Sequence, residues 1–171
     1  MKTIKIILGV IIALSLVFLG TGLFIKETIY TTQVTINKPV DEVFKKFEDT
    51  TLLKEWIPEL QSFDVLEEKA GKIGSSYKMV VENQGQTITM IEKILAYVPN
   101  EKVTFHFDAE NMLKTDDYVF EVANGVTTIT KNTICRSESY LMGCIFPYFK
   151  AKLKEIDQSY LNRFKTVVEK S

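Results

Sequence analysis

A single segment, residues 34–58, constrains the fold of this chain more strongly than any other. It starts as an alternating strand and reaches Pro39, which suits the first turn of a helix because its missing N–H costs nothing there. The residues that follow place one apolar stripe at helical spacing: Val40, Val43, Phe44 and Phe47. Asp49 offers an N-cap for a second short helix, which ends near Trp56 and Pro58. The segment therefore predicts a strand followed by two short helices.

The middle of the chain reads as turn-separated strands. The expected strands cover residues 29–36, 60–67, 76–82, 87–97, 103–108, 117–123 and 126–136. The last two are joined by Asn124-Gly125, a strong signal for a type I′ hairpin. Strands at this spacing predict an antiparallel sheet of about six to seven strands.

A long amphipathic helix is predicted from Met142 to Glu169. Its apolar stripe consists of Ile145, Phe149, Leu153, Ile156, Tyr160, Phe164 and Val167. The charged residues assigned to its solvated face are Lys150, Lys152, Lys154, Glu155, Asp157, Arg163 and Lys165. At about 1.5 Å per residue, such a helix is about 40 Å long and can lie across the concave face of a curved sheet.

The N-terminus carries an uncharged apolar run, residues 6–25, that is long enough to span a hydrocarbon core of roughly 30 Å. A signal peptide is the alternative, because Lys2 and Lys5 form a basic start, but its apolar region is usually only about 7–15 residues long. We expect an uncleaved single-pass anchor over residues 1–27, followed by one domain over residues 28–171. The flanking charges favour a cytoplasmic N-terminus and an extracytoplasmic domain.

Charge and residue usage exclude several function classes. Residues 1–27 hold three of the 21 basic and one of the 22 acidic residues, which leaves the domain with a net charge of about −3. Without a basic track, nucleic-acid binding is not expected. Cys135 and Cys144 are spaced neither as zinc ligands nor as a redox pair, so they are two buried thiols or one disulfide. His106 is the single histidine and alternates out of phase with the apolar positions of its strand, so no metal site and no cofactor are predicted.

The order of these elements resembles the START-like superfamily, also called Bet v 1-like or SRPBCC, which includes polyketide cyclase/dehydratase-type and lipid-transport proteins. The resemblance covers residues 29–170. It is carried by the segments 36–44, 56–58, 71–77, 92–100 and 127–130, which read INKPVDEVF, WIP, GKIGSSY, EKILAYVPN and TTIT. It implies an α+β helix-grip fold, in which the sheet curls around the C-terminal helix.

The resemblance also implies a cavity, often apolar, between the sheet and the C-terminal helix. The side chains expected to line it and bind a ligand are Trp56, Tyr77, Met79, Phe105, Phe107, Tyr118, Phe120, Phe149, Leu153 and Tyr160. The alternative is that the same side chains pack together as a filled core, with Trp56 closing one end of the fold. No catalytic residue is predicted.

Three polar residues on the strands are candidates to point inward: Glu92, Lys114 and Asp116. A carboxyl group in an apolar cavity has a raised pKa and can act as an acid. The plainer alternatives are charges at the cavity mouth or on the solvated face.

Three functions follow from these observations. The leading hypothesis is a membrane-anchored domain that binds a lipid or another hydrophobic small molecule. The second is an enzyme of the polyketide cyclase or hydrolase kind, which requires a buried polar pair at the cavity. The third is a protein-interaction or assembly module with a filled core and an exposed apolar patch.

Overall fold

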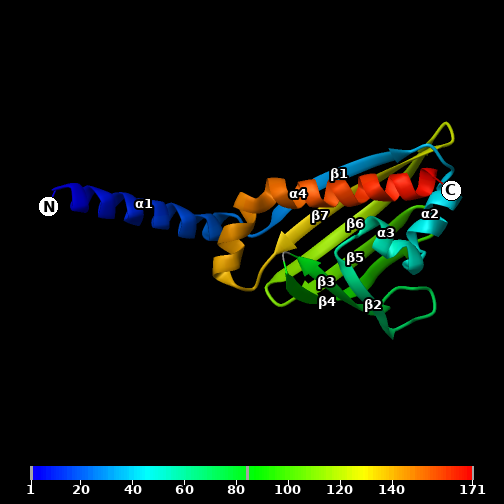
Figure 1. Cartoon of the computed structure of the whole chain (residues 1–171), viewed down its shortest axis with the longest axis horizontal. Helices are drawn as coiled ribbons and strands as arrows, with labels where there is room; N and C mark the ends of the chain where they lie inside the picture. Colours follow the sequence, from blue (N-terminus) through cyan, green and yellow to red (C-terminus); the bar gives the residue numbers. More distant parts are fainter. Residues whose placement is uncertain (1, 84, 171) are drawn as a thin grey trace.

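The computed structural model describes residues 2–83 and 85–170 and begins with helix α1, Lys2–Phe24 (Figure 1). After three connecting residues comes strand β1, Thr28–Ile36. Short helical pieces follow: α2 (Val40–Phe47), the 3-10 turn η1 (Thr50–Leu52) and α3 (Leu53–Trp56). The remaining strands are β2 (Leu60–Glu67), β3 (Ser76–Asn83), β4 (Gln86–Val98), β5 (Lys102–Ala109), β6 (Met112–Ala123) and β7 (Val126–Arg136). Helix α4, Tyr140–Glu169, ends the chain.

Within the described residues, seven strands form one antiparallel sheet in the order β1-β7-β6-β5-β4-β3-β2. Every second residue of β1 is buried, from Thr28 to Ile36, because successive side chains of a strand point to opposite faces. The sheet curves around α4, which lies across its concave side (Figure 1). The predicted α+β helix-grip fold is therefore confirmed.

The segment before β2 folds as its sequence predicts. Helix α2 buries Val43, Phe44 and Phe47 on one face. The Asp49 carboxylate accepts a hydrogen bond from the backbone N–H of Thr51 at 3.0 Å, which is the expected N-cap. These pieces cover one end of the grip, beside the C-terminal end of α4 (Figure 1).

An aromatic cluster joins these helices to α4 and the sheet. The ring of Phe47 lies 4.9 Å from that of Tyr118, 5.2 Å from that of Phe120 and 5.7 Å from that of Phe164, measured between centroids. Trp56 meets Phe164 edge-on at 5.4 Å. Tilted and edge-on contacts at these distances stabilise aromatic pairs beyond the burial of their area. Trp56 thus helps to close one end of the fold.

Helix α4 departs from the predicted apolar stripe in its first third. Pro147 lies inside the helix, where it removes a backbone hydrogen bond, and the axis changes direction near it (Figure 1). The first turns of α4 also pack beside α1, and Phe149, which follows Pro147, is 55% exposed. The prediction that Phe149 points inward is therefore wrong. Beyond the bend the buried residues are Asp157, Leu161, Phe164 and Val168, so the placement of Asp157 on the solvated face is also wrong.

The last turns of α1 rest on the first turns of α4. Gly22 is buried against Cys144, and the Tyr140 hydroxyl donates a hydrogen bond to the Leu19 carbonyl. The hydroxyl groups of Thr21 and Tyr148 lie 2.7 Å apart. The rest of α1 projects away from the domain (Figure 1).

Helix α1 is long and apolar enough to cross a membrane, with a mean hydropathy of 2.6 over its most apolar 18 residues, of which 6% are buried. The same length and composition occur in signal sequences. Cys135 and Cys144 are both buried free thiols, so the alternative of a disulfide between them is not realised.

Replacing Phe164 by Ala tests the aromatic cluster. Because Phe164 is almost fully buried, the variant should lose about 3–5 kcal/mol of unfolding free energy. The measurement is chemical denaturation of the full chain in detergent, followed by Trp56 fluorescence. The matched control is Phe149→Ala, which should change the stability by no more than about 0.5 kcal/mol. Equal losses in the two variants would contradict the assignment of buried and exposed faces.

Candidate functional site

A cavity of about 280 Å³ lies between α4, α3 and the concave face of the sheet. Most of its wall is apolar, and the apolar lining consists of Phe47, Leu53, Trp56, Ile57, Phe63, Met79, Val81, Ile88, Met90, Phe105, Phe107, Met112 and Ile156. The strands supply these side chains from alternate positions, as the two-residue period of a strand requires. The interior of the grip is therefore hollow at this place.

Six of the ten side chains expected to line a cavity do so: Trp56, Met79, Phe105, Phe107, Tyr118 and Tyr160. Tyr77 lines a smaller neighbouring cavity of about 70 Å³. Phe120 lies in the aromatic cluster, where it contacts Phe44 and Phe47. Leu153 packs against a separate group formed by Tyr30, Cys135 and Phe146. Neither Leu153 nor the exposed Phe149 lines the cavity.

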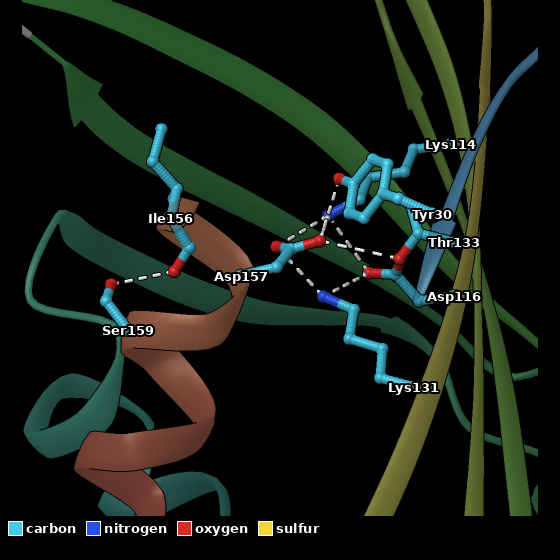
Figure 2. A network of polar contacts seen from close by, with 8 residues as sticks. All are labelled: Tyr30, Lys114, Asp116, Lys131, Thr133, Ile156, Asp157 and Ser159. Carbon is cyan, nitrogen blue, oxygen red and sulfur yellow. Dashed lines mark hydrogen bonds and ion pairs between the residues drawn. The ribbon is translucent and has the colours of Figure 1, made fainter. Parts of the chain in front are cut away.

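Four charged side chains, three of them buried and Lys114 partly buried, form a closed ring in the cavity wall (Figure 2). The Lys131 ammonium lies 3.0 Å from a carboxylate oxygen of Asp116 and 3.0 Å from one of Asp157. The Lys114 ammonium lies 3.2 Å from Asp116 and 3.0 Å from Asp157. Each cation thus contacts both anions, and the ring has no net charge.

Two hydroxyl groups complete the ring. Tyr30 donates a hydrogen bond to Asp157 at 2.8 Å, and Thr133 donates one to Asp116 at 2.7 Å (Figure 2). Lys131 also lies 5.3 Å from the centroid of the Tyr118 ring, within reach of a cation–π contact. The members come from β1, β6, β7 and α4, so the ring joins the helix to three strands of the sheet.

The ring keeps Lys114, Lys131 and Asp157 ionised at neutral pH. Burial pushes the pKa of Asp157 upward, but Lys131 and Lys114 outweigh burial and hold that pKa well below its usual range. Burial also acts to lower the pKa values of Lys114 and Lys131, and the carboxylates of Asp116 and Asp157 more than reverse it. The charges therefore depend on one another, because a single unpaired charge at this depth is costly.

Glu92 on β4 is the buried carboxyl group outside the ring. Its side chain lines the cavity, is 8% exposed, and makes no side-chain hydrogen bond or ion pair within residues 2–83 and 85–170. Burial, reinforced by the negative charge of Asp116, raises its pKa to about 8. At neutral pH the group is therefore mostly a neutral carboxylic acid, which has one O–H to donate.

Two further buried polar atoms in the wall lack a hydrogen-bond partner among the residues that the structure describes. They are Trp56 Nε1, which can only donate, and Glu59 Oε2. The Tyr160 hydroxyl engages the Glu59 carboxylate, and together with burial this bond raises the pKa of Tyr160 above its ordinary value. Unpaired buried polar atoms are rare in folded proteins and often mark a site for water or a ligand.

The cavity is exposed at one end of the sheet. Among the lining residues, Asn83 and Ile88 are the exposed ones, and both lie near the tip of the β3–β4 hairpin. The strand registers bring this tip to the same end as Thr28, where β1 begins, and Arg136, where β7 ends. Because α1 precedes β1 and α4 follows β7, the mouth lies at the end of the sheet from which α1 departs.

The sequence pattern identified part of this site. Glu92, Lys114 and Asp116 line the cavity, so the alternative of the solvated face does not apply to them. Asp157 and Lys131 were missed, although a signal existed for each. Asp157 lies four residues before the buried Leu161, and Lys131 alternates in phase with buried neighbours along β7. A charged residue at a buried position of the strand period, together with one of opposite charge at a buried position of the helix period, indicates an internal ion pair.

The donor set does not favour a metal. Among the described residues, no group of three or more His, Cys, Asp and Glu side chains is arranged to hold one. His106 points away from the cavity, because its neighbours Phe105 and Phe107 point into it, and its Nδ1 lies 3.2 Å from the Thr115 hydroxyl. The arrangement can bind an apolar molecule, direct hydrogen bonds at a polar group on it, and offer a carboxylic acid for proton transfer.

Replacing Lys131 by Met tests the ring. The variant leaves two buried carboxylates with one cation, so it should lose about 3–5 kcal/mol of unfolding free energy. The double variant Lys131→Met, Asp116→Asn restores the charge balance and should recover part of the loss. Both are measured by chemical denaturation of the full chain.

The control for this experiment is Lys152→Met, which removes an exposed ion pair with Glu155 on the outside of α4. Its loss should not exceed about 0.5 kcal/mol. If Lys131→Met were as mild as this control, the ring would not be a stabilising unit.

Comparisons with known proteins agree with the geometry. The sequence profile of the family described as polyketide cyclase/dehydrase and lipid transport matches residues 27–133. A comparison with curated protein sequences found no match.

Solved structures of similar fold come from bacteria and plants. The Zhui aromatase/cyclase from Streptomyces sp. R1128 aligns with a TM-score of 0.71 and 13% identity, over 84% of this chain and 94% of its own. A START superfamily protein from Mycobacterium smegmatis aligns with a TM-score of 0.67 and 14% identity, over 83% and 97% of the two chains. The major latex-like protein 151 from Panax ginseng gives 0.64 and 15%, over 82% and 97%. At these identities the likeness concerns the fold, while the profile match covers more than half of the sequence. The chain belongs to the polyketide cyclase/dehydrase and lipid transport family.

Proposed function

We propose that the protein is a membrane-anchored domain that binds a small lipophilic molecule in the cavity between the sheet and α4. The observation that carries this proposal is an apolar cavity whose wall holds the buried Glu92 side chain and the buried atoms Trp56 Nε1 and Glu59 Oε2, none with a hydrogen-bond partner among the described residues. An apolar pocket with a few convergent polar groups is the usual form of a small-molecule site. A tightly filled core would need no such atoms.

The size of the cavity limits the ligand. A volume of about 280 Å³ holds on the order of ten non-hydrogen atoms, if each takes roughly the 30 Å³ of a water molecule in the liquid. This volume lies at the lower end of the range for ligand pockets. It suits a small lipophile or one short chain, and is too small to enclose a whole two-chain lipid.

We propose that α1 is retained as the anchor and is not removed as a signal. Its last turns cover part of the domain, since Gly22 lies against Cys144 and Tyr140 bonds the Leu19 carbonyl. Cleavage after the small residues near position 22 would uncover Cys144, which is now fully buried. The flanking charges favour an extracytoplasmic domain.

The position of the mouth supports this arrangement. It lies at the end of the sheet from which α1 departs, so a bilayer around α1 would adjoin it. Tethering a site beside its source raises the effective concentration of the ligand without any new contact.

A catalytic role is the second candidate, because the buried polar pairs that it requires are present at the cavity. Lys131 pairs with Asp116, and Glu92 offers an acid with a pKa of about 8. A general acid or base works best with a pKa near the operating pH. In this reading the cavity orients a carbonyl compound whose enolisation or cyclisation Glu92 assists.

Purification of the full chain tests the binding function. We expect native mass spectrometry to detect a bound lipophile of small mass, or organic extraction to release one. An added lipophile of about ten carbons should change the fluorescence of Trp56, which lines the cavity and is the single tryptophan of the chain. No bound molecule and no response to any lipophile would overturn the proposal.

Membrane extraction tests the anchor. We expect the protein to remain in the membrane at alkaline pH, with an intact mass that includes residues 2–24. Gly22→Leu should destabilise the domain by about 1–3 kcal/mol, because the new side chain would collide with Cys144 and Tyr140. The control Gly9→Leu has open space around it and should cause no loss. A mature chain that starts after residue 22, or a silent Gly22→Leu, would refute the retained anchor.

A further inference from the structure

The charges of the ring cancel before any ligand enters. Lys114 and Lys131 each contact both Asp116 and Asp157 at 3.0–3.2 Å. Tyr30 and Thr133 donate into the same carboxylates. A ligand with a full charge would therefore find no opposite charge free in the ring, and would have to break a pair that is already formed.

Glu92 differs from the ring because it makes no side-chain hydrogen bond or ion pair with any described residue. It lies on β4 between Met90 and Ile94, which point to the same face of the strand, and opposite Tyr77 on β3 and Phe107 on β5. Its carboxyl group is buried in this mainly apolar wall without a hydrogen-bond partner in the described part of the chain. As a carboxylic acid it has one O–H group, and a molecule in the cavity can accept the hydrogen bond from it.

We propose that the cavity selects uncharged lipophiles that carry a hydroxyl or carbonyl oxygen, and that the Glu92 carboxylic acid donates a hydrogen bond to this oxygen. The inference rests on the proposed binding function and adds the chemical class of the ligand. Trp56 Nε1 is a second donor without a partner, and Glu59 Oε2 is an acceptor for a ligand hydroxyl. A ketone, ester or alcohol with a chain of about ten atoms meets these groups and fits the volume of about 280 Å³.

Charged ligands of the same length are disfavoured for different reasons. A carboxylate would place its charge near Asp116 and lose its hydration in an apolar wall. An ammonium would lose its hydration in the same mainly apolar wall and would meet the like charges of Lys114 and Lys131.

Ligand binding should depend on pH, because Glu92 donates a hydrogen bond only while it is protonated. Its pKa of about 8 places the loss of the donor between about pH 7 and pH 9, so binding should be strong below this range and weak above it. The other titratable groups of the two cavities that Glu92 lines are Lys114, Asp116 and Tyr118 on β6, Lys131 on β7, Asp157 and Tyr160 on α4, Glu48, Glu59 and Lys72 on connecting segments, Tyr77 on β3 and Tyr97 on β4. Burial and hydrogen bonding raise the pKa values of Tyr118 and Tyr160 further above neutrality, and the ring holds Lys114, Lys131 and Asp157 ionised.

The test compares four probes of matched length on the full chain in lipid nanodiscs: 2-decanone, decanoate, decylamine and decane. Binding is followed by Trp56 fluorescence at pH 6.5, with each dissociation constant referred to the free aqueous probe. We expect 2-decanone to bind roughly tenfold or more tightly than either ion. It should bind about fivefold more tightly than decane, which lacks the acceptor. The advantage over decane should disappear at pH 9.5.

Two variants connect the preference to Glu92. Glu92→Gln keeps a neutral donor, so it should bind 2-decanone within about threefold of the parent chain and lose the pH dependence. Glu92→Leu should bind 2-decanone about fivefold more weakly and decane at least as well. Circular dichroism and the unfolding midpoint of each variant establish that it is folded.

The outcomes separate this inference from the proposed function. If no probe binds, decane included, the proposed function fails. If all four bind equally, the cavity binds lipophiles but the selection of uncharged oxygen compounds is wrong. Tighter binding of decanoate or decylamine, or an unchanged preference in Glu92→Leu, would also overturn the inference.

Discussion

The closed ring of Lys114, Lys131, Asp116 and Asp157 is the interaction on which the rest of this structure depends. The ring holds α4 to the sheet beside the cavity, where apolar side chains do not fill the space between helix and sheet. Apolar side chains alone would bring the helix down until the space was filled, since interiors pack to a uniform density. Polar groups of fixed length, each satisfied by the others, keep the helix at a defined distance. Such a ring adds less stability than well-packed apolar side chains would, and in return it fixes one arrangement.

The two ends of the grip are built by different means. At one end, Phe47, Trp56 and Phe164 pack into a closed aromatic cluster. At the other end, α4 bends near Pro147, and its first turns contact α1. The cavity lies between the aromatic cluster at one end and the open end of the sheet, where α1 begins. The mouth, α1 and the bend of α4 are therefore at the same end, and the aromatic cluster is at the opposite end.

Much of the fold could be predicted from the sequence because local periodicity determines it. The alternation in β1, the stripe of α2 and the cap at Asp49 involve only neighbouring residues, and all three are present. The errors arose where distant residues decide. Phe149 fits a straight helix, but the bend at Pro147 and the packing of α1 turn it outward. The helical pattern alone places Asp157 on the solvated face. It is buried because it pairs with Lys114 and Lys131, which lie on strands that are remote in the sequence. The inward position of Glu92 was one of the alternatives that the strand pattern left open, whereas its lack of a partner among the described residues required the whole structure.

The connection between α1 and β1 is only three residues long, from position 25 to position 27. Fully extended, it reaches no more than about 10 Å. With α1 in a bilayer, as proposed, the domain would be confined to a shell of that thickness above the lipid headgroups. It could not travel to a second membrane with its ligand, as a diffusing carrier does. The domain would instead exchange molecules with the same leaflet repeatedly, so its occupancy would report the local concentration of a dissolved lipophile and would not move it elsewhere.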